Sequence, residues 1–221
     1  MDFIFMLTNN DRTVDDAMDV LEQVRSTGLT HVGFKDVGAT PQQQKELAQA
    51  AHEAGMTVYL EVVSTSVEAE LASVRAGVAA GVDWILGGTN PDQALEILKG
   101  SGVNYAPFPG RIVGHPSLLE GTIEEIAADA ARLTSMDGVA GLDLLAYRHQ
   151  DVDPLELTKA VVASSSGPVI AAGSVVTKEQ IVGLAQAGAV AFTIGGAIFD
   201  GRVPGDTIAD KVAVALDWAD A

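Results

Sequence analysis

Short apolar segments recur along the chain at intervals of about 25 to 30 residues, and nearly all of them open on a glycine. Each segment is apolar at both odd and even positions, which is typical of a parallel strand covered on both faces. The glycine suits the left-handed residue that ends a preceding helix. The pattern predicts eight strands, within residues 3–7, 28–34, 55–61, 81–86, 102–106, 141–145, 167–171 and 188–194.

The segments between these strands have the pattern of helices. Three of them begin with a capping side chain directly before a proline, which is a strong helix-start signal. These pairs are Thr40-Pro41, Asn90-Pro91 and Asp153-Pro154. The predicted helices cover residues 13–26, 41–53, 67–79, 91–99, 123–133, 154–163, 178–187 and 206–218.

Eight strands that alternate with eight helices predict an α/β protein with a single domain, residues 1–221, folded as a (β/α)8 TIM barrel. An open doubly wound sheet is the alternative. The turn Thr8-Asn9-Asn10-Asp11 after the first strand argues against it, because it lacks the glycines of a dinucleotide-binding loop. A barrel would place the chemistry at the carboxyl ends of its strands.

Composition narrows the classes of function. The chain has 221 residues, of which 48% are hydrophobic and 19% charged, so a disordered chain is excluded. It has no cysteine, which excludes disulfides and thiol chemistry. A net charge of −17 argues against nucleic acid and anionic membranes as partners. The sequence has no apolar run long enough to span a membrane and no pattern of a signal peptide, so we expect a cytoplasmic protein. We also expect it to assemble as a homodimer.

The strongest local signal follows the seventh and eighth predicted strands. Gly173-Ser174 precedes a helix, and Gly195-Gly196 opens a short helical turn. Glycines at such positions let an anion approach the backbone amides, and a helix N-terminus adds partial positive charge. We therefore expect these four residues to bind a phosphate. In the alternative interpretation, the glycines only close tight turns.

The segments Ala-Gly-Ser-Val-Val-Thr at 172–177 and Ile-Gly-Gly-Ala-Ile-Phe at 194–199 resemble motifs of the ribulose-phosphate-binding barrel superfamily. That group contains phosphosugar isomerases, sugar-phosphate epimerases and a keto-gulonate-phosphate decarboxylase. The resemblance implies a small phosphorylated metabolite as the ligand and a reaction that needs no cofactor. Some epimerases of the group hold a metal with strand-end histidines. The one histidine in a predicted strand here, His31, stands at the opposite end, so we expect no metal site.

Lys35 ends the second predicted strand, and Glu61 lies in the third, which is its neighbour in a barrel. The two side chains form an acid/base pair in one interpretation. In a second, Lys35 forms a Schiff base with a substrate carbonyl, and in a third the pair is a structural ion pair. Asp143 in the sixth strand is a further candidate catalytic carboxylate. By strand parity, Arg148 would point to the opposite face from Asp143.

The longest connection, residues 107–116, follows the fifth strand and contains three prolines. Its stiffness and its polar side chains are typical of a loop that covers a site. Together with the polar residues at the ends of other strands, it supplies the side chains expected to bind the substrate. These are Thr8, Asn10, Asp36, Arg111, His115 and Arg148.

Three functions remain open. The first is an isomerase or epimerase of a phosphorylated sugar, in which Glu61 or Asp143 removes a proton beside the carbonyl and Lys35 stabilises the enolate. The second is a lyase, either a Schiff-base aldolase that uses Lys35 or a decarboxylase. The third is a non-catalytic protein that binds a phosphometabolite. In that case the catalytic candidates would be fully paired with one another and remote from the phosphate loops.

Overall fold

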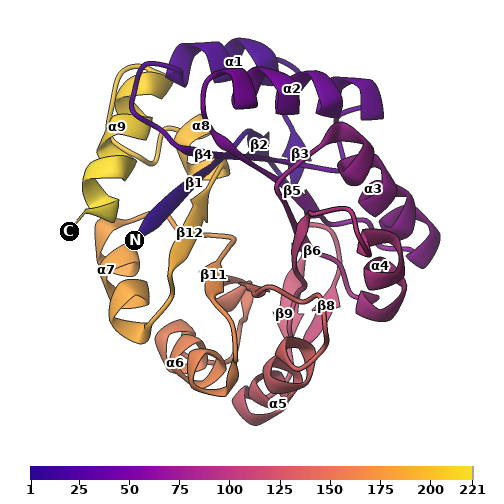
Figure 1. Ribbon diagram of the computed structural model, residues 1–221. Helices are drawn as coiled ribbons and strands as arrows, with labels where there is room; N and C mark the ends of the chain where they lie inside the picture. The colour runs from indigo at the N-terminus through magenta and orange to yellow at the C-terminus, as the bar shows by residue number, and fades with distance from the viewer. Residues whose placement is uncertain (221) are drawn as a thin grey trace.

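The computed structural model, which describes residues 1–220, contains eight parallel strands inside a ring of helices (Figure 1). Along the sheet the order is β10-β11-β12-β1-β4-β5-β6-β7. The strands are β1 (Asp2–Met6), β4 (His31–Lys35), β5 (Thr57–Val62), β6 (Trp84–Gly87), β7 (Asn104–Ala106), β10 (Leu142–Leu144), β11 (Val169–Ala171) and β12 (Ala191–Ile194). All eight lie within or beside the predicted segments, and the TIM-barrel prediction is confirmed.

The barrel closes between β7 and β10, the two ends of the sheet. The amide of Ala140 donates to the carbonyl of Tyr105 at 2.8 Å, and the amide of Asp143 donates to the carbonyl of Pro107 at 3.1 Å. These bonds bring β10 across from β4 and β5, so a side chain on β10 can face Lys35 and Glu61 through the barrel interior.

The helices begin and end close to their predicted bounds, because local capping signals define them. Thr40, Thr122 and Thr177 each accept the amide of the residue three positions later, as a capping box requires. The helices are α1 (Ala17–Val24), α2 (Pro41–Glu53), α3 (Val67–Ala80), α4 (Pro91–Leu98), α5 (Ile123–Thr134), α6 (Pro154–Ser164), α7 (Lys178–Ala187), α8 (Gly196–Phe199) and α9 (Ile208–Ala219).

One predicted helix start is wrong. Helix α1 begins at Ala17 rather than at Thr13, because Arg12 and Thr13 form a short strand, β3 (Arg12–Thr13), that pairs with β2 (Thr8–Asn9). The turn between them consists of Asn10 and Asp11, with φ of 49° and 56°. Two central residues with positive φ are what a type I′ hairpin turn needs, and asparagine and aspartate tolerate them.

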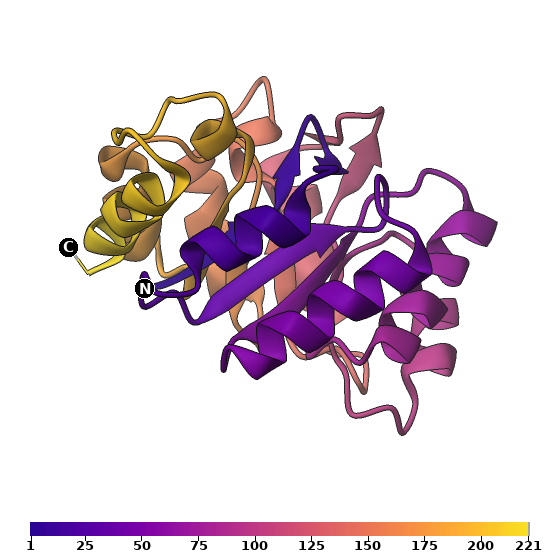
Figure 2. The same cartoon turned by 90° about the horizontal axis from the view of Figure 1, so that it is seen from above.

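The long connection after β7 is more ordered than predicted. It contains a second hairpin, β8 (Arg111–Val113) and β9 (Leu118–Glu120), in which Arg111 forms an ion pair with Glu120. Leu119 packs into the hydrophobic core beside Ile126 of α5, so the base of this hairpin is anchored. Figure 2 shows both hairpins rising from the same end of the barrel.

Strand alternation decides which side chains enter the barrel. Ile4, Met6, Tyr59, Leu86 and Ile170 form an apolar cluster inside it, while the intervening residues pack outward against the helices. Lys35 and Glu61 occupy the same parity as the interior residues of their strands, two positions beyond Gly33 and Tyr59. The interior is therefore apolar in its middle and charged toward the carboxyl ends of the strands.

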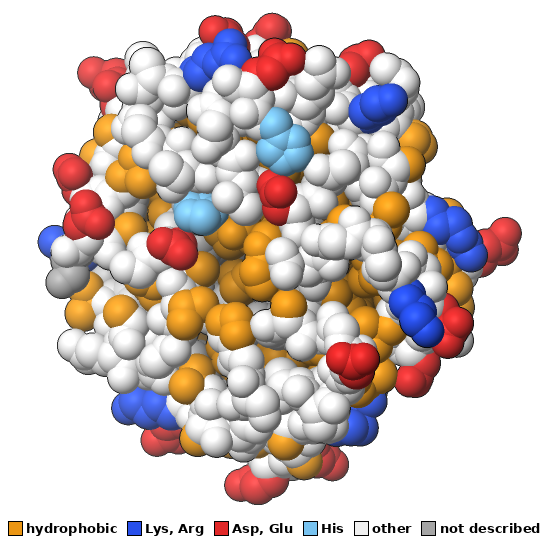
Figure 3. Space-filling view, in the orientation of Figure 1, with side chains coloured by type: hydrophobic (Ala, Val, Ile, Leu, Met, Phe, Trp, Pro, Cys, Tyr) orange, Lys and Arg blue, Asp and Glu red, His pale blue; other side chains and the backbone are white. Residues whose placement is uncertain are grey.

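The face opposite the hairpins is shown in Figure 3, where charged side chains lie mainly around the rim and apolar ones nearer the centre. Within residues 1–220, no helix is both long enough and apolar enough to cross a bilayer.

Candidate active site

A cavity of about 380 Å³ opens at the carboxyl ends of the strands, beneath the two hairpins. Its walls come from the ends of β1, β4, β5 and β12, from the tips of both hairpins, and from the loops after β10 and β11. Nine of the residues predicted from the sequence line it: Thr8, Asn10, Lys35, Glu61, Arg148, Gly173, Ser174, Gly195 and Gly196.

Lys35 and Glu61 lie directly opposite each other in the register of β4 and β5. The ammonium Nζ of Lys35 is 3.2 Å from Oε1 of Glu61, and both side chains are 4% exposed. Because the residues share an inward parity, their side chains meet over the barrel interior and line the cavity. The pair predicted from the sequence is thus formed, at the floor of the cavity.

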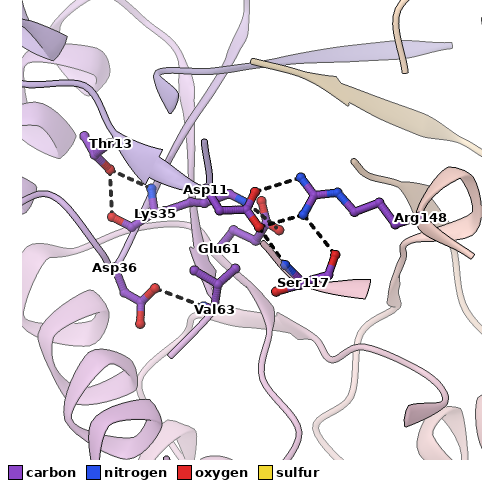
Figure 4. Close-up of polar contacts among 8 residues, drawn as sticks. All are labelled: Asp11, Thr13, Lys35, Asp36, Glu61, Val63, Ser117 and Arg148. Carbon is purple, nitrogen blue, oxygen red and sulfur yellow. Dashed lines mark hydrogen bonds and ion pairs between the residues drawn. The ribbon is translucent and has the colours of Figure 1, made fainter. Parts of the chain in front are cut away.

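Asp11 is the residue of this cluster that sequence reasoning missed. The hairpin turn carries it back over the barrel, where its Oδ1 lies 2.8 Å from Lys35 Nζ (Figure 4). Arg148 donates to both of its oxygens, at 2.6 and 2.7 Å, and the amide of Ser117 donates to Oδ2 at 2.9 Å. Asn10 and Asp11 both adopt positive φ in this turn. In the sequence, the signal for such a turn is an Asn-Asp pair between two short polar segments.

The partners of Asp11 decide its charge. Burial alone would favour the protonated acid, but the hydrogen bond from Arg148 and the charges of Lys35 and Arg148 hold the pKa of Asp11 well below its usual range. The effect is mutual. Although burial opposes the guanidinium charge, the hydrogen bond to Asp11 raises the pKa of Arg148. These two residues therefore form a permanent, bidentate ion pair in the wall of the cavity.

Asp143 has the opposite environment. It pairs in register with Ile170, which belongs to the interior cluster, so its side chain also faces the inside of the barrel. It is fully buried, and neither carboxyl oxygen has a hydrogen-bond partner within the described chain. Burial and the neighbouring Glu61 carboxylate raise the pKa of Asp143 well above its usual value, against the smaller opposing charges of Lys35 and Arg148. Asp143 does not line the cavity itself.

The parity argument for Arg148 is wrong. Strand β10 ends at Leu144, and a 3₁₀ turn, η1 (Ala146–Arg148), follows it. Strand alternation does not continue through a helical turn, so Arg148 turns toward the same cavity above Asp143 rather than away from it.

The two glycine loops predicted to bind phosphate form one wall of the cavity. The amides of Gly173, Ser174 and Gly195 donate to no other group within residues 1–220. Gly173 and Ser174 both have positive φ, at 73° and 60°. A Cβ at Gly195 would lie 2.7 Å from the carbonyl of Thr8 in β2 and 3.0 Å from the carbonyl of Met6 in β1, so the close approach of this backbone also requires the glycine.

A comparable loop after β6 is already occupied by a side chain. The carboxylate of Glu70, which is buried, accepts the amides of Thr89 and Asn90 at 3.0 and 2.9 Å. It thereby satisfies the two amides that directly precede α4 from within the chain. The amides of this loop are therefore already bonded, unlike those of Gly173, Ser174 and Gly195.

Three predicted substrate-binding residues lie outside the cavity. Asp36 points away from it and accepts the amide of Val63 at 2.9 Å and the hydroxyl of Ser73 at 2.8 Å, so its carboxylate holds the loop after β5 (Figure 4). Arg111 is exposed on its hairpin and pairs with Glu120. His115 is exposed at the tip of that hairpin. For these three, position at a strand end or in the loop was not enough, because the hairpin and the local hydrogen bonds set the direction of each side chain.

No protein-family model and no curated protein sequence matches the chain. Solved structures do. Orotidine 5′-phosphate decarboxylase from Pyrococcus horikoshii superposes with a TM-score of 0.70 over 99% of this chain and 99% of that one, at 11% identity. This chain has the same fold as that enzyme.

Two further structures extend the likeness. N-acetylmannosamine-6-phosphate 2-epimerase from Clostridium perfringens has a TM-score of 0.66 over 99% of this chain and 92% of its own, at 11% identity. A structure described as native KDPGal has a TM-score of 0.67 over 100% and 97% of the two chains, at 16% identity. At these identities the likeness shows the fold, and the barrel fold implied by the resemblance of segments 172–177 and 194–199 is confirmed.

Proposed function

We propose that the chain is a cofactor-independent isomerase or epimerase of a small phosphorylated sugar or a related phosphometabolite. The observation that carries the proposal is the pairing of Lys35 with Glu61 in a cavity whose opposite wall presents free backbone amides. One wall can bind an anion while the floor supplies a base and a cation. Neighbours of the same fold are named as a decarboxylase and an epimerase of phosphorylated compounds, which supports a ligand of this class.

The chemistry follows from the positions of the charges. The amides of Gly173, Ser174, Gly195 and Gly196 would hold the phosphate. The Glu61 carboxylate would take the proton from the carbon beside the substrate carbonyl, and the electron pair of the broken C–H bond would move onto the carbonyl oxygen. The ammonium of Lys35 would stabilise that oxygen as it becomes negative. For an isomer, the proton returns from Glu61 to the former carbonyl carbon while the hydroxyl proton of the adjacent carbon moves to the enolate oxygen. For an epimer, Glu61 releases its proton to water, and a water molecule in the cavity donates a proton to the same carbon from the opposite face.

Asp143 is assigned a supporting role in this scheme. Burial and the Glu61 carboxylate raise the pKa of Asp143 and favour its protonated form. Because Asp143 is fully buried and does not line the cavity, it would act on the charges of the cavity floor rather than touch the substrate.

The arrangement of Lys35 speaks against the Schiff-base alternative. A Schiff base requires a deprotonated amine, but Nζ is flanked by the carboxylates of Asp11 and Glu61 at 2.8 and 3.2 Å. Both ion pairs would have to break before the amine could attack a carbonyl. The non-catalytic alternative requires catalytic candidates that are fully paired and far from the phosphate loops. Asp143 is unpaired, and Lys35 lines the same cavity as Gly173.

Proton exchange tests the proposal directly. The protein is incubated with a panel of aldose and ketose phosphates in deuterium oxide, and NMR follows deuterium entering the carbon beside the carbonyl. For a substrate, exchange should slow by about 10²- to 10⁴-fold in Lys35→Met and in Glu61→Gln, the usual contribution of one acid or base. The matched controls are Lys45→Met and Glu46→Gln, both exposed on α2, which should exchange at the wild-type rate.

The same samples separate the alternatives. Covalent trapping of substrate on Lys35 by borohydride, or release of carbon dioxide, would replace the isomerase by a lyase. Tight binding of the phosphate esters without any exchange or conversion would leave a binding protein and refute the proposal.

A further inference from the structure

Asp11 joins three parts of the chain that are far apart in the sequence. It contacts Lys35 at the end of β4, Arg148 in η1, and Ser117 in the hairpin β8–β9. Its side chain is 2% exposed, so these groups replace water around the carboxylate. Thr13, the next residue but one, exchanges two hydrogen bonds with the backbone of Lys35, at 2.8 and 2.9 Å, and this fixes the hairpin β2–β3 on β4.

The hairpin β8–β9 is held at two places. Leu119 anchors its second strand in the core. Near its exposed tip, the amide of Ser117 donates to Asp11 at 2.9 Å, and the carbonyl of Ser117 accepts from Arg148 at 3.1 Å. Pro116 and Ser117 belong to the wall of the cavity. The contact of this tip with the opposite rim therefore runs through the Asp11–Arg148 pair, like a latch across the opening.

We propose that Asp11 is a positioning residue that orients the ammonium of Lys35 and latches the hairpin β8–β9 across the cavity. One carboxylate serves both partners, so the oriented lysine and the closed hairpin form a single state. The part that concerns Lys35 rests on the proposed function, whereas the latch stands on the contacts of Ser117 alone.

Charge balance distinguishes this role from substrate binding. Lys35 and Arg148 carry two positive charges, and Asp11 and Glu61 carry two negative ones, so the cluster around the cavity is neutral when Asp143 is protonated. Removing the charge of Asp11 leaves one positive charge in excess. An anionic ligand should then bind as tightly as before or more tightly, even though the group that reacts with it is misplaced.

The first experiment needs no substrate. Hydrogen exchange by NMR is compared for the wild type, Asp11→Asn, and the exposed control Asp15→Asn. In Asp11→Asn, the Ser117 amide should lose its charged acceptor and exchange about 10- to 100-fold faster, while the core strands keep their protection. The ¹⁵N signal of the Lys35 ammonium should broaden or vanish. Wild-type protection at Ser117 together with an unchanged Lys35 signal would overturn the proposal.

The second experiment uses turnover of the phosphate ester identified by deuterium exchange. Asp11→Asn should lower kcat by about 10²-fold, because misplacing a reacting group by about 1 Å has that effect. The Kd for inorganic phosphate should be unchanged or lower. Equal losses of kcat and of phosphate affinity would instead make Asp11 a scaffold residue and overturn its positioning role. If no ester is turned over, the proposed function fails, and the exchange of Ser117 still decides the latch.

A second variant covers the case in which Asp11→Asn does not fold. Asp11→Glu keeps the charge but moves the carboxylate by one methylene group. The amide of Ser117 should again exchange faster and the ¹⁵N signal of Lys35 should again broaden, both by less than in Asp11→Asn. The melting temperature should stay close to that of the wild type. A folded Asp11→Glu variant with wild-type exchange at the Ser117 amide and a wild-type ¹⁵N signal at Lys35 would refute the need for a precisely placed carboxylate.

Discussion

Arg148 lies directly on Gly173. A Cβ built at Gly173 would fall 2.8 Å from Cδ of Arg148 and closer still to its Nε. Gly173 also has a φ of 73°, so two separate constraints exclude a side chain there. The glycine predicted to admit a phosphate therefore also makes room for the arginine that holds Asp11.

Replacing Gly173 with alanine should destabilise the fold and also move Arg148. The positive φ alone should lower the free energy of unfolding by about 1–2 kcal/mol. Gly55→Ala is the matched control, since Gly55 has a φ of 77° but no atom within 4 Å of the place where an alanine methyl group would lie. By urea denaturation Gly173→Ala should lose more stability than Gly55→Ala, because its methyl group must also displace Arg148. A Gly173→Ala variant whose stability, phosphate affinity and turnover matched Gly55→Ala would contradict the contact with Arg148.

Gly196→Ala should weaken phosphate binding without harming the fold. Gly196 does not have positive φ, and its added Cβ would meet only Oδ1 of Asn9, at 3.2 Å, and Oδ2 of Asp200, at 3.9 Å. We expect about a 10-fold higher Kd for inorganic phosphate by calorimetry, the effect of one weakened bond to a charged group. The melting temperature should stay at its wild-type value. Gly195 is a poorer probe, because a side chain there would collide with the backbone of Thr8.

Asp143 should make the stability of the protein depend on pH. Burial and the Glu61 carboxylate raise its pKa in the folded state, whereas the unfolded chain titrates near about 3.9. Between those two pKa values the folded chain keeps a proton that the unfolded chain releases, so the contribution of Asp143 falls as the pH rises. In the Asp143→Asn variant the side chain at this position cannot ionise, so its contribution to stability does not change with pH.

Relative to the wild type, Asp143→Asn should therefore gain stability as the pH rises above about 4, the pKa of the unfolded chain. Urea denaturation at a series of pH values measures the difference, with the exposed Asp15→Asn as the control. A difference that stays constant over this range would mean that Asp143 is ionised in the folded protein at all of these pH values, or titrates as it does in the unfolded chain.

Asp36→Asn should affect stability and not the reaction. The carboxylate of Asp36 accepts hydrogen bonds from Val63, Ser64 and Ser73, which hold the loop after β5 against α3. Weakening these bonds should lower the free energy of unfolding by about 1–3 kcal/mol. Turnover per folded molecule and KM should remain at wild-type values. An increased KM at full stability would return Asp36 to the substrate-binding residues.

The amino-acid sequence was sufficient for the elements of the barrel, because strand and helix signals act over a few residues. The Thr40-Pro41 cap and the short run within 55–61 that is apolar at both odd and even positions are examples, and the structure has α2 and β5 there. Lys35 and Glu61 were also within reach of sequence reasoning. Consecutive strands of such a barrel are neighbours, and both residues lie close to the carboxyl ends of their strands.

The tertiary structure alone decided how the cluster around Lys35 is completed. Asp11 meets Ser117 and Arg148 across 106 and 137 residues of chain, and no local pattern encodes such contacts. They depend on the type I′ turn that reverses the chain at Asn10, on the hairpin β8–β9, and on the closure of the barrel between β7 and β10. Likewise, Asp36 and Asp143 are both aspartates close to strand ends. One is satisfied by a neighbouring loop, and the other is enclosed without a partner, because side-chain direction is set by the packing of distant segments.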